Sequence, residues 1–228
     1  MRSIFILLVA VLFATPALEA QNNQYTSVSD SDPEAVKLVN SLRKKYDAYS
    51  TLSADFRLDI TLPNSPVESQ KGALSRRGEE VRFTLGDQEG IINAEAAYLI
   101  QHANKEVMIN NLPEPGETNG MLTPQTLFSF YEGDSFILAF QGKENVKGRK
   151  LTSIELKPVD RDNSEFTKLR LLVDEVKKEL VTVMAFSRDG ANFAFHLDKT
   201  RGNVSLNDDT FVFKKAAFPG YHVEDLRF

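Results

Sequence analysis

The sequence predicts a mainly β (α+β) protein: a single curved antiparallel sheet forming an incomplete β-barrel, with an N-terminal helix and a helical lid insertion. Three observations predict this fold. Residues 52–62 alternate between apolar and polar side chains, similar short segments recur along the chain, and a stretch rich in Pro, Gly and Phe (110–142) interrupts them. Because twist accumulates in a large sheet, such a sheet curls, and its apolar concave face must be filled.

The first twenty residues are typical of an export signal. The uninterrupted apolar run from Ile4 to Phe13 is too short for a membrane-spanning helix, which needs roughly 20 residues. Small residues allow cleavage after Ala20 or after Ala17. We therefore expect a soluble protein of the periplasm. It divides into a signal peptide (residues 1–20), a flexible N-terminal segment (residues 21–31) and one domain (residues 32–228).

Composition excludes several classes of function. The chain of 228 residues has a net charge of −5, which argues against a nucleic-acid partner. It has no Cys, which excludes disulfides, thiolate metal sites and a lipidated N-terminal cysteine. His102, His196 and His222 have no metal-ligand spacing, and no nucleophile or phosphate-loop motif is present. We therefore predict no metal, no cofactor and no enzymatic activity.

The N-terminal helix has both a start signal and an apolar stripe. Asp32, Pro33 and Glu34 are suited to the N-cap, the first helical position and the first turn. Apolar residues then recur at steps of three or four, which predicts an amphipathic helix with one face against the sheet. These residues are Val36, Val39, Leu42, Tyr46 and Tyr49.

The strands follow in two blocks. Residues 52–62 have the period of two that a strand with one apolar face requires. Shorter alternating segments with turn residues between them predict an antiparallel meander of about ten strands. In the first block they are residues 70–76, 81–85, 89–93, 97–101 and 106–109, and in the second 151–158, 166–173, 180–186, 191–199 and 210–213.

The interruption between the blocks predicts a loop and two short helices. Residues 110–122 contain two Pro and two Gly, so they form a loop, and Thr123-Pro124 can start a helix. We expect a second helix after Gly133 that ends at Gly142. Both are apolar nearly all round, so they must be covered on more than one side or act as a movable cap.

Together these features resemble the LolA family of periplasmic carriers of outer-membrane lipoproteins. The resemblance is carried by Ser53-Ala54-Asp55-Phe56-Arg57, Gly72-x-Leu74-x-x-Arg77, Thr123-Pro124 and the ending from Phe211 to Arg227. It implies a half-barrel whose helical lid covers a hydrophobic cavity for acyl chains. It also implies two protein partners, an inner-membrane ABC transporter that releases lipoproteins and an outer-membrane acceptor. We expect a monomer.

The candidate site follows from the apolar residues and from the resemblance. The expected cavity wall consists of Phe56, Leu58, Ile60 and Phe83. The expected lid consists of Leu127, Phe128, Phe130, Tyr131, Phe136, Ile137, Leu138 and Phe140. The resemblance also implies an arginine latch that holds the lid shut. Arg77 matches it, although Gly78 stands where the family has proline and the spacing is one residue short, so Arg76 is the alternative.

Two other functions are compatible with the same residues. The sheet could belong to a lipid-sensing or protein-interaction module without transfer activity. It could also hold an enzyme for a hydrophobic small molecule, although no catalytic set supports one. Lipid bound to the purified protein would favour a carrier, and a partner that binds the ligand-free protein would favour a sensor.

Overall fold

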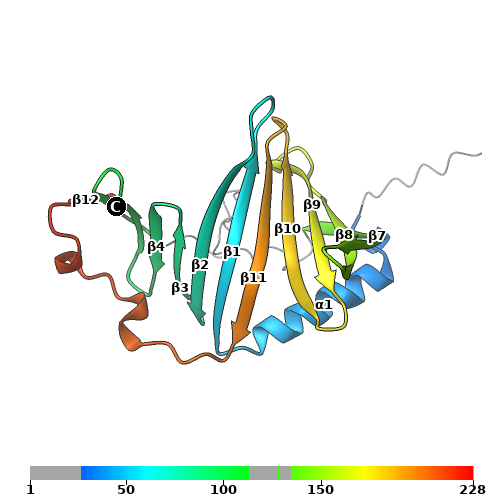
Figure 1. Cartoon of the computed structure of the whole chain (residues 1–228), viewed down its shortest axis with the longest axis horizontal. Coiled ribbons are helices and arrows are strands. Elements are labelled where there is room, and N and C mark those ends of the chain that lie inside the picture. The colour runs from blue at the N-terminus through cyan, green and yellow to red at the C-terminus, as the bar shows by residue number, and fades with distance from the viewer. Residues whose placement is uncertain (1–26, 113–127, 129–134, 228) are drawn as a thin grey trace, which may run out of the picture.

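The computed structural model describes residues 27–112, 128 and 135–227, and a single sheet dominates this part of the chain (Figure 1). Its twelve strands lie in the order β12-β6-β5-β4-β3-β2-β1-β11-β10-β9-β8-β7. All neighbours are antiparallel except β12 and β6, and the sheet is open, with β12 and β7 at its edges. The predicted signal peptide lies outside the described residues.

The strand bounds agree with most of the expected segments. The first block contains β1 (Thr51–Thr61), β2 (Glu68–Arg77), β3 (Glu80–Leu85), β4 (Gln88–Ile92), β5 (Ala97–Gln101) and β6 (Glu106–Asn110). The second contains β7 (Phe136–Val146), β8 (Arg149–Pro158), β9 (Phe166–Asp174), β10 (Glu179–Ser187), β11 (Asn192–Gly202) and β12 (His222–Asp225). The prediction of an open curved antiparallel sheet with an N-terminal helix is confirmed.

Helix α1 (Pro33–Asp47) packs on one face of this sheet, which we call the inner face. Its buried residues are Ala35, Val39, Leu42 and Tyr46. The helix begins at the expected N-cap, Asp32, but the carboxylate of Asp32 does not cap the helix. It accepts a hydrogen bond of 2.7 Å from the amide of Phe140 at the edge of β7. The residue before α1 thus closes one open edge of the sheet.

The segment before α1 is more ordered than predicted. Residues Val28–Asp30 form a 3-10 turn, η1, within the stretch expected to be flexible. The hydroxyl of Ser31 accepts a hydrogen bond of 3.0 Å from the amide of Leu138, and the amide of Asp32 donates to the carbonyl of Leu138 at 2.8 Å. These bonds to β7 fix residues that have no regular sequence pattern.

The second expected helix is wrong, because Phe136 to Val146 form strand β7. Phe136, Leu138 and Phe140 pack against the core of the inner face, whereas Ile137 and Ala139 are buried on the opposite side. A strand buried on both faces is apolar at every position, and a short apolar run of this kind cannot be distinguished from a buried helix by its period. Of the first expected helix, only residue 128 is described.

The expected strand at residues 210–213 is also wrong. Asp208–Phe211 form a 3-10 turn, η3, and Lys215–Ala217 form another, η4. The chain then crosses to the far edge of the sheet, where β12 pairs in parallel with β6. The alternation of Phe211 and Phe213 comes from a tail packed across the sheet and not from a strand within it.

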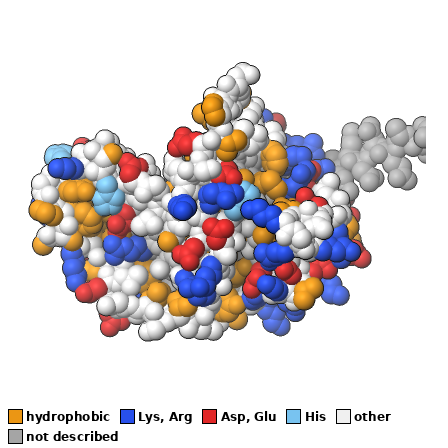
Figure 2. Space-filling view, in the orientation of Figure 1, with side chains coloured by type: hydrophobic (Ala, Val, Ile, Leu, Met, Phe, Trp, Pro, Cys, Tyr) orange, Lys and Arg blue, Asp and Glu red, His pale blue; other side chains and the backbone are white. Residues whose placement is uncertain are grey.

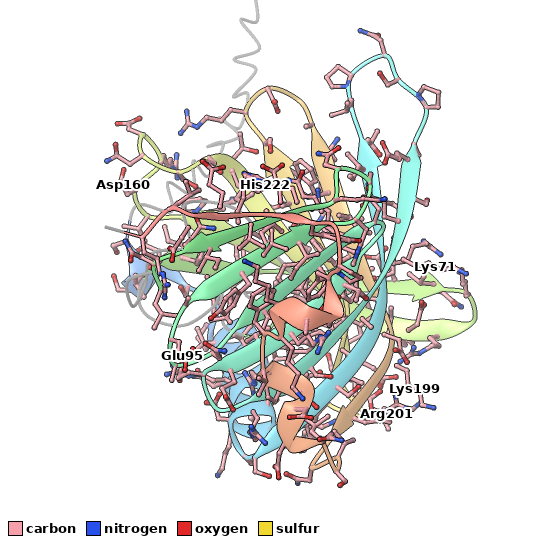
Figure 3. The ribbon with its side chains drawn as sticks, turned by 90° about the vertical axis from the view of Figure 1, so that its left-hand side faces the viewer. Lys71, Glu95, Asp160, Lys199, Arg201 and His222 are labelled. Carbon is pink, nitrogen blue, oxygen red and sulfur yellow. The ribbon has the colours of Figure 1, made fainter. Side chains whose placement is uncertain are left out.

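Two hydrophobic clusters lie on opposite faces of the sheet. The larger is on the inner face, where α1 covers β1 and β8 to β11. The smaller is on the outer face of β4 to β6, where the C-terminal tail covers Ile91, Tyr98 and Val107. Figure 3 views the sheet from its β12 end, and Lys71, Lys199 and Arg201 project on one side, from the outer face.

Candidate functional site

The inner face contains a row of directly paired apolar residues that runs from the centre of the sheet toward β12. Ala54 of β1 pairs with Leu74, and Leu74 pairs with Phe83. The row continues through Gly90 and Leu99 to Met108 of β6. Since paired residues share a face, this row extends the apolar inner surface beyond α1. Ala54 and Leu74 are buried, whereas Phe83, Leu99 and Met108 are only half-buried.

Two rings of the inner face lie flat on glycines of the neighbouring strand. A Cβ on Gly72 would lie 2.3 Å from Cζ of Phe56, and a Cβ on Gly90 would lie 2.2 Å from Cε1 of Phe83. Glycine is therefore required at both positions if each ring is to lie against the backbone.

The four expected wall residues differ in burial. All four are on the inner face. Phe56 and Leu58 are 2% and 5% exposed and belong to the core. Ile60 and Phe83 are half-buried at its margin. Only the second pair offers surface to a guest molecule without repacking of the core.

The expected lid residues fall into three groups. Leu127, Phe130 and Tyr131 lie outside the described residues. Phe128 is buried, and its ring centre lies 4.9 Å from that of Tyr46 on α1. Phe136, Ile137, Leu138 and Phe140 belong to β7, and three of them are half-buried on the inner face. These three therefore lie on the inner face at the opposite edge of the sheet from Met108.

The two candidate latch arginines point to opposite faces. Arg76 pairs with the buried Leu52, which places it on the inner face, and its guanidinium donates to the carbonyl of Tyr46 at 3.0 Å. Arg77 is on the outer face, where it lies 2.9 Å from Glu80 and 4.9 Å from the ring centre of Phe211. Arg76 thus contacts α1 and Arg77 contacts the C-terminal tail, and the latch role of either arginine stays a prediction.

The outer face holds a polar network that the sequence did not indicate. The hydroxyl of Ser69 donates to Asp59 at 2.6 Å, and Arg57 donates to the same carboxylate at 2.9 Å. Nε2 of His196 is 3.2 Å from Asp59, and its Nδ1 is 3.3 Å from the hydroxyl of Thr182. The hydrogen bonds from Arg57 lower the pKa of Asp59, and burial lowers the pKa of His196.

This network has the residue types of a catalytic triad, but its geometry favours a structural role. Thr182 is 3% exposed, so a substrate cannot approach its hydroxyl. The partners lie on adjacent strands, because Thr182 pairs with His196 and His196 pairs with Arg57. The bonds therefore join β2, β1, β11 and β10 on the outer face. A sequence gives no local signal for such a network, since its members are distant along the chain.

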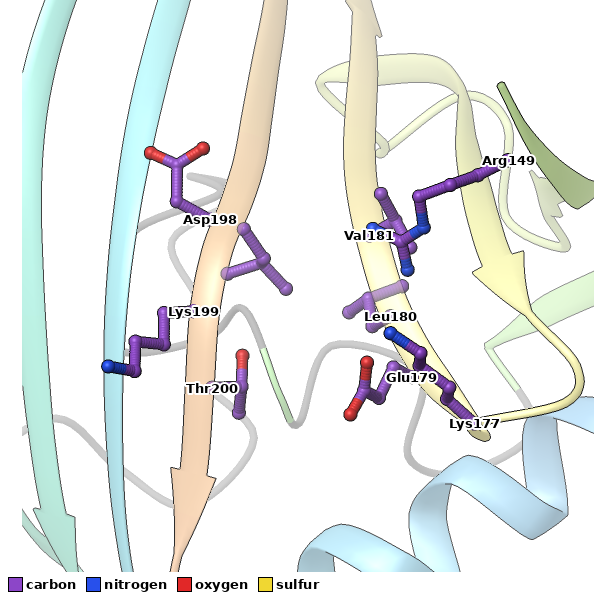
Figure 4. Close-up of a pocket in the computed structure, with 9 residues that line it drawn as sticks. Arg149, Lys177, Glu179, Leu180, Val181, Asp198, Lys199 and Thr200 are labelled. Atoms are coloured by element: carbon purple, nitrogen blue, oxygen red, sulfur yellow. The ribbon is translucent and has the colours of Figure 1, made fainter. Parts of the chain in front are cut away.

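A polar cleft of about 200 Å³ opens between β10 and β11 (Figure 4). The ladder between these strands ends at the pair Thr182 and His196, beyond which the strands diverge. Arg149, Lys177 and Glu179 line the cleft on its β10 side. Most of its lining is polar, although Leu180 and Leu197 of the inner-face cluster also line it. It does not provide the predicted cavity for acyl chains.

The C-terminal tail forms an aromatic cluster on the outer face near β12. The ring of Phe213 stacks on Tyr98 at 4.5 Å and on Phe218 at 5.6 Å. Tyr221 meets Phe218 edge-on at 5.4 Å, and its hydroxyl is 2.9 Å from Nδ1 of His102. Figure 2 shows hydrophobic and His side chains together at this end of the molecule. The cluster fixes the conformation of the motif that carries much of the LolA resemblance.

Comparisons with known proteins show similarity in fold only. The chain is similar to an uncharacterized conserved protein from Thermus thermophilus, with 7% identity, 86% of this chain and 99% of that chain covered, and a TM-score of 0.54. It is also similar to the LolA superfamily protein NE2245 from Nitrosomonas europaea (9% identity, 78% and 97% covered, TM-score 0.42). A third similar structure is LprF from Mycobacterium bovis (11% identity, 79% and 99% covered, TM-score 0.46). No family model matches, and no curated protein matches.

The sheet order and helix α1 confirm the expected open curved sheet with an N-terminal helix, and the comparisons say nothing of cargo. Within the described residues, no helix has the length and apolar character needed to cross a membrane. The same residues contain no cluster of three or more His, Asp or Glu side chains able to hold a metal ion.

Proposed function

We propose that this protein is a non-enzymatic periplasmic carrier that binds the acyl chains of lipoproteins against the inner face of its sheet. The observation that carries the proposal is the half-buried apolar surface beyond α1, formed by Phe83, Leu99 and Met108. Alkyl chains gain roughly 0.8 kcal/mol for each buried CH₂ group, so a surface of this kind can bind them without a polar anchor. Because the surface is only partly buried, the bound chain can also be released.

The proposed transfer runs from an inner-membrane ABC transporter to an outer-membrane acceptor. The predicted signal peptide and the absence of Cys support a soluble protein outside the inner membrane. The buried Thr182 supports a role without catalysis.

Lipid loading tests the proposal. The protein is purified from the periplasm and examined by native mass spectrometry, and a labelled lipoprotein released from spheroplasts is added to test co-purification. We expect bound lipid and a soluble complex with the lipoprotein. Leu99→Glu should abolish both, because it places a charge on the inner face. The matched control Val212→Glu changes an exposed residue of the tail and should keep both. Wild-type protein that retains neither lipid nor lipoprotein contradicts the carrier.

A further inference from the structure

The hairpin between β1 and β2 projects beyond every other described element. It rises above the sheet in two perpendicular views (Figures 1 and 3). Its tip, residues 62–67, contains no charged residue. Leu62 is 49% exposed and Val67 is 57% exposed, and two prolines lie between them. Figure 2 shows hydrophobic side chains on this projection. The tip is therefore a convex apolar surface in water.

The tip has a defined shape. The amide of Ser65 donates to the carbonyl of Leu62 at 3.2 Å, which closes a β-turn. Pro63 fixes the first central position, and Asn64 has a φ of 58° at the second, as a type II turn requires. Pro63 also lies beside Gly190 of the β10–β11 turn, where an added Cβ would be 3.2 Å away. A rigid tip loses little conformational entropy when it binds.

The tip continues the apolar stripe of the inner face. Along β1, the alternate residues change from Leu58, 5% exposed, through the half-buried Ile60 to Leu62 at 49%. Ile60 is paired with the half-buried Phe193 of β11. An apolar path thus extends from the core to the end of the hairpin. In contrast, the exposed Val176 lies in the turn between β9 and β10, at the opposite end of the strands, and has charged residues on both sides.

We propose that residues 62–67 contact a lipid surface. A convex tip fits a planar interface, whereas a protein partner would need a matching pocket. Its aliphatic residues lack the Trp, Tyr and Arg side chains that dominate protein interfaces. The biological role of this contact rests on the proposed function. A tip in the membrane interface would align the apolar stripe with the bilayer from which acyl chains come.

A single tryptophan reports on the contact, because the chain has no Trp. Leu62→Trp and the control Val176→Trp are each mixed with phosphatidylcholine vesicles, which do not repel a chain of net charge −5. We expect the emission of Leu62→Trp to shift to shorter wavelength and to become protected from aqueous quenchers. The emission of Val176→Trp should not change. No shift at position 62, or an equal shift at both positions, overturns the proposal.

A second measurement uses native side chains. In co-sedimentation with the same vesicles, combined Leu62→Glu and Val67→Glu should lower the bound fraction on the order of tenfold, because lipid does not solvate the two charges. Val176→Glu is the control and should bind as wild type does. Equal binding by all three proteins overturns the proposal. Since Leu99→Glu removes lipid loading without changing the tip, vesicle binding by that variant separates failure of the carrier from failure of the tip.

Discussion

The two halves of the sheet are covered on opposite faces. In the packed half, formed by β1 and β7 to β11, α1 fills the inner face and the outer face carries ion pairs such as Lys168 with Glu155. In the open half, formed by β2 to β6 and β12, the C-terminal tail covers the outer face. Several inner side chains of the open half, such as Phe83 and Leu99, are only half-buried. One sheet thus provides stability at one end and accessible apolar surface at the other.

This difference suggests how a binding surface can remain open without loss of the fold. The open half obtains its own core from aromatic residues of the tail, which bury Tyr98 and Val107 from outside. Its strands therefore do not depend on a filled inner face. Under the proposed function, a guest would enter or leave there while α1 and the packed half stay unchanged.

The largest expected difference between the halves concerns a phenylalanine in each. Phe195→Ala removes a ring that is 1% exposed in the packed half, and we expect a loss of about 3–5 kcal/mol in the free energy of unfolding. Phe83→Ala removes a half-buried ring of the open half and should cost about 1–1.5 kcal/mol. Urea unfolding followed by circular dichroism measures both. Equal losses would mean that the open half is packed as tightly as the other.

The next effect concerns the contact between α1 and the packed half. The hydroxyl of Tyr46 accepts a hydrogen bond of 3.0 Å from the buried amide of Leu180, and burial raises its pKa to about 12. Tyr46→Phe leaves that amide without its partner and should cost about 1–3 kcal/mol. The raised pKa means that this contribution is present below pH 10 and is lost as the pH rises toward 12.

Chemical denaturation at pH 7 and at alkaline pH measures this effect. The difference between wild type and Tyr46→Phe should become smaller above pH 10, because only wild type loses stability when Tyr46 ionises. Tyr49→Phe is the control, since its half-buried ring meets that of Tyr46 edge-on at 6.1 Å. A difference that is the same at both pH values would contradict the role of the hydroxyl.

The sequence determines most of the packed half and little of what makes the open half distinctive. The spacing of apolar residues was sufficient to predict β1 and α1, because each has one apolar face over its whole length. It failed for Phe136 to Phe140, where both faces of β7 are covered. It also could not show that the tail crosses to β6, because that pairing joins residues more than one hundred positions apart.

The alternation along the strands showed which of the expected wall residues share a face of the sheet, but not how deeply each one is buried. The expected wall residues share the inner face because alternation along a strand fixes direction. Which of them are accessible depends on how much of the inner face α1 covers, and that is determined by tertiary packing. For the same reason the sequence could not distinguish Arg76 from Arg77. Consecutive residues of a strand point to opposite faces, and only the pairing of β2 with β1 shows that Arg76 is the one on the face of α1.

A smaller effect is expected from the tail. Phe218→Ala removes one half-buried ring from the stack on Phe213 and should cost about 1 kcal/mol. The loss should appear first in β4 to β6, because these strands depend on the tail for their outer core. Hydrogen exchange resolves the two halves, and we expect faster exchange at Ile100 and Val107 with no change at Leu171. Uniform acceleration across the sheet would mean that the halves unfold as one unit.

The smallest effect concerns pH and the outer face of the central strands. Burial, with a further contribution from Arg57, lowers the pKa of His196 below its ordinary value of 6.5. The folded protein therefore binds a proton at His196 less readily than the unfolded chain does, so stability is complete above about pH 6.5 and declines below it. His196→Gln keeps a polar partner for Asp59 and Thr182 but does not titrate. Urea midpoints between pH 7 and pH 5 should fall less steeply in this variant than in wild type. Carboxylates that do not contact His196 titrate alike in both proteins, so they do not affect the comparison. Parallel pH profiles would show that protonation of the imidazole does not change the stability of the sheet.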